Sequence, residues 1–185
     1  MADEQTKRFG FSSDVLPSET FAVVRFRGEE GLSRCYRFEL ELVAEDAAID
    51  LAAVLAASAA FTIFRAEEDI CFHGILAEFD QLQQMGNYVF YRAVLVPKMW
   101  RMSLTHHNQV FLNQTVPQIL EACFKDAGLS GMDFELRLMK DYPAWEYVCQ
   151  YRESHLAFVS RWMEREGIYF YFEQGAGGEK VILTD

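Results

Sequence analysis

The stretch QYRESHLAFVSRWMEREGIYFYFEQ, residues Gln150 to Gln174, predicts a helix followed directly by a strand. Ser154 is placed to cap the helix, and Gly167 is placed to end it, because glycine adopts the left-handed conformation at a helix end without strain. After Gly167 the apolar period changes from 3.6 residues to 2, as in a strand. The predicted apolar face of the helix is Leu156, Phe158, Val159, Trp162 and Met163.

Alternating segments earlier in the chain predict antiparallel strands. In residues 34–43, RCYRFELELV, Tyr36, Phe38, Leu40 and Leu42 point one way while the intervening charged residues point the other. Further strands are predicted at 21–27, 61–65, 70–82, 87–97, 168–174 and 179–185. The glycine in QMGN, at position 86, suits the tight turn of a hairpin between two of them.

Two more helices are predicted. Residues 49–58 are alanine-rich and favour a short helix. Residues 116–127 carry an amphipathic pattern that begins after Thr115 as the cap and ends at Gly128. Residues 98–112 show neither period, so we predict an irregular segment there.

These elements predict a mixed, β-rich α+β fold of antiparallel strands with short amphipathic helices, which follows a polar leader of about 16 residues. The strand at 87–97 is apolar on both faces, so a second layer should cover it. That layer can belong to this chain, to the rest of a longer chain or to another subunit.

Composition excludes several classes of partner. The net charge is −11, and of 17 basic residues only five are lysines, so no cationic stripe can follow a phosphate backbone or an anionic membrane. No apolar run has the roughly 18 to 20 residues that a spanning helix needs, and the N-terminus has no signal-peptide pattern. The protein should be made in the cytosol, with its four cysteines reduced and packed as small apolar side chains.

Residues that can carry chemistry do not form a recognisable catalytic or metal-binding pattern. Ser154 and His155 are adjacent, so on a helix they point about 100° apart and do not form a nucleophile and base. His106 and His107 lack a third ligand at metal spacing and should be loop residues, and His73 fits a half-buried strand position.

The remaining candidates also have structural explanations. The carboxylates at 67–69 fit a solvated turn, and the glycines at 175–178 fit a hairpin turn. Asn113 begins a glycosylation triplet, but its Thr115 already serves as a helix cap. We therefore predict no catalytic, cofactor-binding or metal-binding residues, no cofactor and no enzymatic activity.

Several motifs together resemble the N-terminal region of VgrG spike proteins of the bacterial type VI secretion system, which are similar to contractile phage tail hub proteins. The motifs are GLSRCYRFELEL, FHGIL, YRAVLVPKMWRMSL, VFLNQTVPQILEACF and YRESHLAFVSRWMEREGIYFYFE. Each motif alone is modest, but their order and spacing are specific. The resemblance extends from about Phe21 to the end of the chain.

The resemblance implies a structural hub with a phage tail hub-like fold of antiparallel β-barrel-like modules and short amphipathic helices. On this basis we assign residues 1–16 to a polar leader, 17–97 to a first β-barrel-like module and 98–185 to a second α/β module, which is incomplete if the chain is a fragment. Such proteins form homotrimers with pseudo-sixfold symmetry that dock onto the hexameric Hcp tube, contact baseplate components and effectors, and help to puncture target cells. It also implies a protein that is cytoplasmic before firing and is then secreted or delivered, without stable membrane insertion or nucleic-acid binding. The family has no catalytic residues in this region.

Two alternatives remain open at this stage. A phage or prophage tail baseplate hub shares the same motifs. A small-ligand-binding β-barrel module would instead need an apolar cavity in its interior, which Tyr36, Phe38, Phe90 and Tyr91 should fill.

Overall fold

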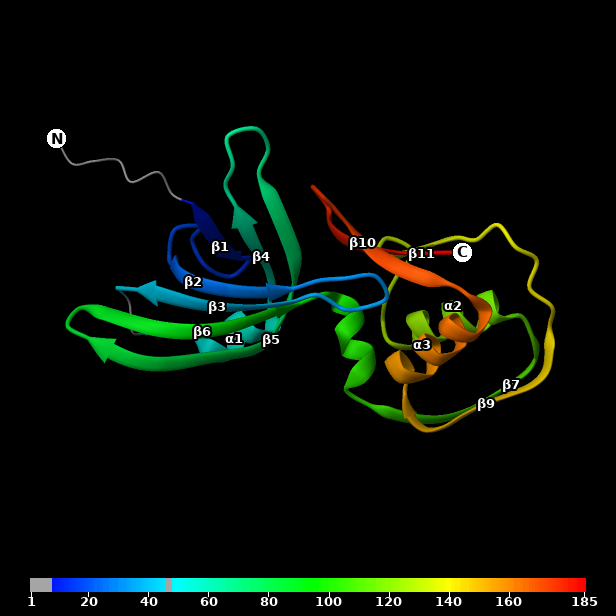
Figure 1. Ribbon diagram of the computed structural model, residues 1–185. Helices are drawn as coiled ribbons and strands as arrows, with labels where there is room; N and C mark the ends of the chain where they lie inside the picture. The colour runs from blue at the N-terminus through cyan, green and yellow to red at the C-terminus, as the bar shows by residue number, and fades with distance from the viewer. Residues whose placement is uncertain (1–7, 46–47) are drawn as a thin grey trace. The chain divides into compact units, whose positions relative to one another are not determined.

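The computed structural model describes residues 8–45 and 48–185, which form two compact units (Figure 1). The first unit contains residues up to Glu30, Tyr36–Pro97 and Ala176–Gly178, and the second contains Gly31–Cys35, Lys98–Gly175 and Glu179–Asp185. Part of the expected polar leader, residues 1–7, lies outside the described residues. Among the helices of the described ranges, none combines the length and apolar character needed to cross a membrane.

The first unit is built on one antiparallel sheet. Its strand order is β1-β4-β5-β6-β3-β2, with helix α1 between β3 and β4 in the chain. The elements are β1 (Phe9–Ser13), β2 (Ala22–Glu29), β3 (Arg37–Ala44), α1 (Leu51–Ala56), β4 (Ser58–Ile63), β5 (Ile70–Met85) and β6 (Tyr88–Val96).

The sheet of the first unit curls into a half-barrel. Its outermost strands β1 and β2 approach each other, and the rings of Phe9 and Phe26 meet edge to face with centroids 5.0 Å apart (Figure 1). Phe61 lies 4.8 Å from Phe26 and 5.5 Å from Phe38, so aromatic rings fill the concave side. Burial of these rings supplies much of the apolar driving force for the unit.

Two features of the first unit differ from the sequence-based expectation. Residues Phe9–Ser13, inside the expected leader, form β1 because Phe9 and Phe11 pair with β4 and add rings to the core. The second face of β6 is covered only in part: Val94 and Val96 are buried, but Tyr88 is exposed and Arg92 forms ion pairs there.

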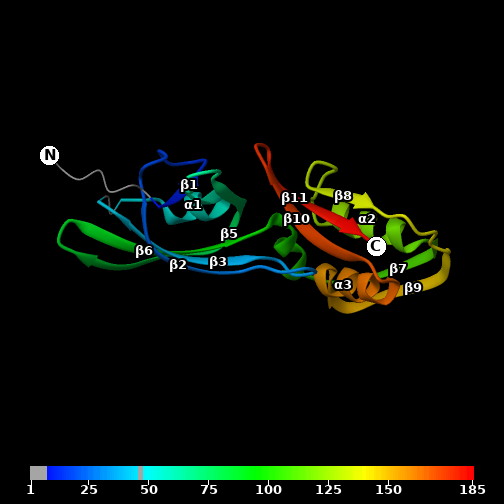
Figure 2. The same ribbon diagram turned by 45° about the horizontal axis from the view of Figure 1, so that its top comes forward.

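The second unit combines a two-stranded ribbon, a three-stranded sheet and two helices (Figure 2). Strands β7 and β9 pair antiparallel, and the other sheet has the order β10-β11-β8, in which β11 and β8 are parallel. The elements are η1 (Lys98–Ser103), β7 (His106–Gln114), α2 (Val116–Asp126), β8 (Phe134–Arg137), β9 (Trp145–Ser154), α3 (His155–Glu166), β10 (Tyr169–Gly175) and β11 (Gly178–Thr184).

The predicted caps of α2 and α3 are confirmed. Thr115 and Gln118 form a reciprocal capping box at the start of α2, and Gly128 follows its end with φ of 81°. The Ser154 hydroxyl accepts a hydrogen bond from the Ala157 amide, and Gly167 ends α3 with φ of 74°. The predicted order of a capped helix, a glycine stop and a strand is therefore confirmed for residues 154–174.

The prediction of an irregular segment at 98–112 is wrong. Residues Lys98–Ser103 form a 3-10 helix, and His106–Gln114 form β7. The first four residues of β7, HHNQ, are polar on both sides of the strand, and the next three, VFL, are apolar on both sides, so the alternation that marks a strand is weak. Its partner β9 is also distant in the chain, as the pairing of Leu112 with Tyr147 shows.

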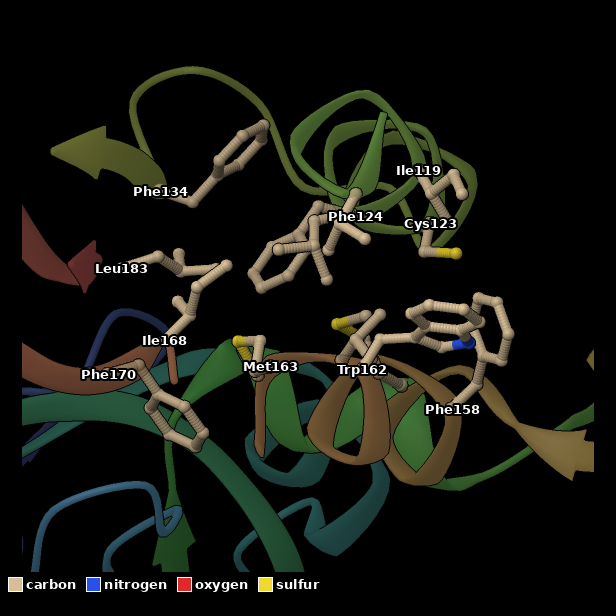
Figure 3. Packing of buried hydrophobic residues seen from close by; sticks show 14 of the residues in the cluster. Ile119, Cys123, Phe124, Phe134, Phe158, Trp162, Met163, Ile168, Phe170 and Leu183 are labelled. Atoms are coloured by element: carbon tan, nitrogen blue, oxygen red, sulfur yellow. The ribbon is translucent and has the colours of Figure 1, made fainter. Parts of the chain in front are cut away.

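One apolar cluster holds the second unit together. Figure 3 shows Phe158, Trp162 and Met163 projecting from α3 towards Phe124 and Cys123 of α2. Trp162 is 6% exposed, and the Trp145 ring meets it edge to face with centroids 5.5 Å apart. The apolar face predicted for α3 is therefore the core of this unit.

Replacing Trp162 with alanine should lower the free energy of unfolding by about 3 to 5 kcal/mol, because it leaves a cavity between α3 and its neighbours. Urea denaturation followed by circular dichroism measures the change. The control is Leu104→Ala, whose side chain is 58% exposed and which should alter stability by less than about 0.5 kcal/mol. Equal effects of the two substitutions would contradict a core role for Trp162.

A second prediction concerns Gly74 in β5. A Cβ at this position would lie 2.2 Å from the backbone oxygen of Val96 on β6, so Gly74→Ala forces the two strands apart and should cost at least about 1 to 3 kcal/mol. Gly177→Ala is the matched control, because no described atom lies within 4 Å of a Cβ there. A melting temperature of Gly74→Ala equal to that of the control would refute this steric account.

Candidate assembly surface

Ser154 and His155 have separate structural roles. Ser154 caps α3 through its hydroxyl, while His155 is buried and its Nε2 lies 2.8 Å from Asp126 Oδ2. Ser154 therefore acts as a helix cap, as predicted. Because His155 Nε2 faces Asp126, His155 does not serve as a general base for the Ser154 hydroxyl.

The four histidines of the chain lie on strands or at a helix start. His73 is on β5 with its Nε2 3.5 Å from Cys71 Sγ. His106 and His107 are on β7, not in a loop, and they point to opposite faces: His106 is exposed, and His107 stacks on His155 with ring centroids 3.8 Å apart. No sequence pattern indicates this stacking, because the two histidines are 48 positions apart in the chain.

The other sequence candidates lie in turns or caps. Residues 67–69 are exposed, and Asp69 accepts a hydrogen bond from the Arg65 amide. Asn113 is exposed next to the capping Thr115, and Gly175 and Gly178 flank the turn between β10 and β11. The fold does not bring the carboxylates at 67–69, Asn113 or these glycines next to another candidate site residue among the described residues.

A partly buried ionic cluster joins η1 to the three-stranded sheet of the second unit. Lys98 Nζ lies 2.9 Å from Asp133 Oδ1, and the Lys98 amide donates to Glu179 Oε1 at 2.8 Å. Burial alone would raise the pKa of Asp133, but hydrogen bonds from Ser130 and Lys98 outweigh it and hold that pKa below its usual value. These structural contacts fully explain the lowered pKa of Asp133.

The four cysteines are unpaired and differ in burial. Cys123 is buried, and the other three are half-buried. Burial raises the pKa of both Cys35 and Cys123 to about 12. A thiolate nucleophile is therefore not available at either position near neutral pH.

The outer face of the first unit carries a network of ion pairs. Arg92 lies 2.7 Å from Glu39 and 2.7 Å from Glu78, and Arg37 pairs with Glu78 at 3.0 Å. The Arg92 guanidinium lowers the pKa of Glu39, and that of Arg37 lowers the pKa of Glu78. These partly exposed residues form ion pairs across strands β3, β5 and β6. The face is therefore exposed to solvent, and its opposite charges neutralise one another.

The most unusual surface is on the β7–β9 ribbon, where the side away from the helices carries an exposed apolar patch. We call this surface the apolar strip and define it as Val110, Leu112, Tyr147, Cys149 and Tyr151. Leu112 pairs with Tyr147 and Val110 with Cys149, so their side chains are adjacent across the ribbon. Apart from the half-buried Cys149, the strip residues are 52% to 64% exposed.

The strip has the composition of an interface core. It contains two tyrosines and two aliphatic side chains and no charged side chain, which is the pattern of protein–protein contact surfaces. A hydrogen bond to Cys149 raises the pKa of the Tyr147 hydroxyl, so the ring stays neutral. On the opposite face of the ribbon, Phe111 and Val148 are buried in the core, so the strip is held on a rigid support.

Together, the curled antiparallel sheet, the helix-backed ribbon and the exposed apolar strip define a structural subunit of the phage tail hub class. The chain matches the phage tail baseplate hub (GPD) family over residues 29–185, and it belongs to that family.

Relatives in secretion systems are similar over the whole chain. The sequence is 36% identical to the type VI secretion system spike protein VgrG1b and 37% identical to VgrG1c, both of Pseudomonas aeruginosa, over 100% of this chain and 25% of each relative. It is 30% identical to the actin cross-linking toxin VgrG1 of Vibrio cholerae, over 97% of this chain and 17% of that protein. The chain thus spans about a quarter of the length of its first two relatives.

Solved structures agree with this relationship. The E. coli c3393 protein, a type VI secretion component described as structurally similar to T4 bacteriophage tail proteins gp27 and gp5, superposes with a TM-score of 0.87 at 32% identity, over 95% of this chain and 48% of that one. A prophage MuSo2 tail protein of Shewanella oneidensis shares the fold alone, with a TM-score of 0.60 at 15% identity over 96% of this chain and 53% of that one. The predicted phage tail hub-like fold and VgrG resemblance are confirmed.

The Asp133 cluster gives a pH-dependent prediction. Because the pKa of Asp133 is lower in the folded chain, its stabilising effect is present above the unfolded-state pKa of about 4 and is lost as pH falls through the folded pKa. Asp133→Asn should lower the free energy of unfolding by about 1 to 3 kcal/mol at pH 7.

Urea unfolding at a series of pH values tests this prediction. The difference between the parent chain and Asp133→Asn should shrink below about pH 4, whereas the exposed control Asp141→Asn should behave like the parent. If the difference in the free energy of unfolding between the parent and Asp133→Asn instead grew as the pH fell, the proposed stabilising role of the ionised Asp133 would be contradicted.

Proposed function

We propose that this chain is the hub region of a type VI secretion spike, with a structural and not an enzymatic role. In this proposal three copies assemble, the two modules at 17–97 and 98–185 contribute to a pseudo-sixfold ring, and the ring docks onto the Hcp tube. The protein is cytoplasmic before firing and is then delivered with the spike and its effectors. Family membership and identity to the VgrG proteins over the whole chain support this assignment.

The single observation that supports assembly most directly is the apolar strip. The chain carries a net charge of −11, so two copies repel each other over most of their surfaces, and close approach is favourable only where charge is absent. The strip offers such a face, with exposed Tyr147 and Tyr151 beside Leu112. Tyrosine suits this position because its ring buries apolar area while its hydroxyl stays hydrogen-bonded.

The alternatives fit the structure less well. A small-ligand barrel needs interior space, but rings including Phe38, Phe61 and Phe72 pack with centroids 4.3 to 6.5 Å apart inside the first unit. A phage or prophage tail hub has the same fold and differs in its tube partner. The higher identity to secretion spikes than to the prophage tail protein favours the secretion system.

The proposed role of the apolar strip in assembly can be tested by introducing a charge at one of its residues. Leu112→Asp places a carboxylate in the centre of the strip and should convert a trimer into a monomer, as measured by light scattering over a range of concentrations. Met139→Asp is the matched control, because Met139 is 90% exposed and lies outside the strip. A parent chain that stays monomeric at every concentration, or a trimer unaffected by Leu112→Asp, would contradict the proposed contact.

The hub role has a separate readout in cells. With the same two substitutions in the full-length protein, Leu112→Asp should reduce the release of Hcp into the medium to background, while Met139→Asp should leave release unchanged. Normal release after deletion of the full-length gene, in a strain with no second spike gene, would overturn the hub assignment whatever the chain's oligomeric state.

A further inference from the structure

Two histidines and one aspartate converge at one corner of the second unit. His107 comes from β7, Asp126 from the last residue of α2 and His155 from the first residue of α3. Their ligand atoms all lie within 4.8 Å of one another. Strand β7 and helix α2 are consecutive elements, but His155 lies 29 positions beyond Asp126, so the cluster forms only when the start of α3 packs against them.

The separations between the ligand atoms are close to those of a tetrahedral metal site. Asp126 Oδ2 lies 2.8 Å from His155 Nε2 and 3.9 Å from His107 Nδ1. Zinc bonds of 2.0 to 2.2 Å place tetrahedral ligands roughly 3.3 Å apart, and the two observed values lie on either side of that distance. The His107 and His155 rings are stacked with centroids 3.8 Å apart, so binding of one ion requires the His107 ring to turn out of the stack until its Nδ1 lone pair points to the ion beside Asp126 and His155.

The surroundings orient two of the three groups. The second ring nitrogen of His107, Nε2, lies 2.8 Å from the Thr105 hydroxyl, which leaves Nδ1 to face Asp126. Metal-bound histidines commonly hold their other nitrogen in this way. The Asp126 side chain is 50% exposed, so water can reach a fourth position.

The set of ligand atoms determines which ions the cluster suits. Asp126 Oδ2 also accepts a hydrogen bond from Gln109 Nε2 at 3.2 Å. Two imidazoles and one carboxylate suit zinc and similar transition ions, whereas calcium and magnesium prefer oxygen ligands only.

We propose that His107, Asp126 and His155 form a binding site for one divalent transition ion of the zinc type per chain, with water as a further ligand. The site has no role in the hub assignment, and neither proposal depends on the other. A bound ion would join the end of α2 and the start of α3 to β7, the strand that presents Val110 and Leu112 on its other face. It would therefore stiffen the support of the apolar strip.

A simpler explanation is that the cluster is only a hydrogen-bonded group. His155 donates to Asp126 when its proton is on Nε2, and binding an ion there moves that proton to Nδ1. Because His155 Nδ1 is buried and has no hydrogen-bond partner among the described residues, an N–H there would be unsatisfied, which limits the affinity. The two explanations differ in whether the chain binds an ion at all.

The test is calorimetric titration of the chelator-treated, untagged chain with zinc chloride, with magnesium chloride as the ion control. We expect one zinc ion per chain, no magnesium binding and a higher melting temperature with zinc. His107→Gln and Asp126→Asn should each weaken zinc binding by more than about 10-fold, and circular dichroism confirms that both variants fold. Asp126→Asn keeps an oxygen that can accept from His155, so its fold is retained.

Two histidine variants outside the cluster are matched controls. His106→Gln changes the neighbouring residue on the opposite, exposed face of β7, and His73→Gln removes the histidine beside Cys71. Both should bind zinc like the parent chain. Absence of saturable zinc binding, a stoichiometry below one per chain, or equal weakening by His106→Gln would overturn the proposal.

Discussion

The second unit depends on the contact between the apolar face of α3 and the core side of α2. Phe158, Trp162 and Met163 enter this contact from α3 and meet Phe124 (Figure 3). Burial of such side chains contributes about 1.5 to 3 kcal/mol each, while the helices alone, at 11 and 12 residues, are too short to persist in water. Tertiary packing therefore stabilises the helices, and the helices in turn support the ribbon.

The same packing explains why the ribbon can carry an apolar strip. A two-stranded sheet is marginal by itself in water, but Phe111 and Val148 anchor one side of this ribbon in the helical core. The other side is then free to present Val110, Leu112 and Tyr147 without loss of the fold. An exposed apolar surface of this kind marks a candidate contact site, and the separate core allows the ribbon to carry it.

In the first unit, the two sides of one sheet have different roles. Its concave side is closed by aromatic contacts such as that of Phe9 with Phe26, and its convex side carries the Arg92 network. Ion pairs of this exposure add little stability, but they neutralise one another and keep the convex side soluble. The apolar and charged faces together specify the register of the strands, because a shift of one residue would exchange them.

The sequence by itself determined the local elements, because their signals are local. Thr115, Ser154 and Gly167 fix helix ends through contacts within a few residues, and the alternation in 34–43 assigns the faces of β3 without reference to any partner. The order of motifs was also enough to indicate the family. The absence of a local catalytic pattern supported the prediction of a structural protein.

Only the tertiary structure decided which distant segments meet. Strand β7 escaped prediction because its stability comes from β9, and β1 escaped because its rings are buried by strands far along the chain. The apolar strip and the cluster of His107, Asp126 and His155 share this origin. Contacts between distant segments produce no periodic pattern in the sequence. The apolar strip, proposed to bind other copies, and the cluster, proposed to bind an ion, can therefore be recognised only in the folded chain.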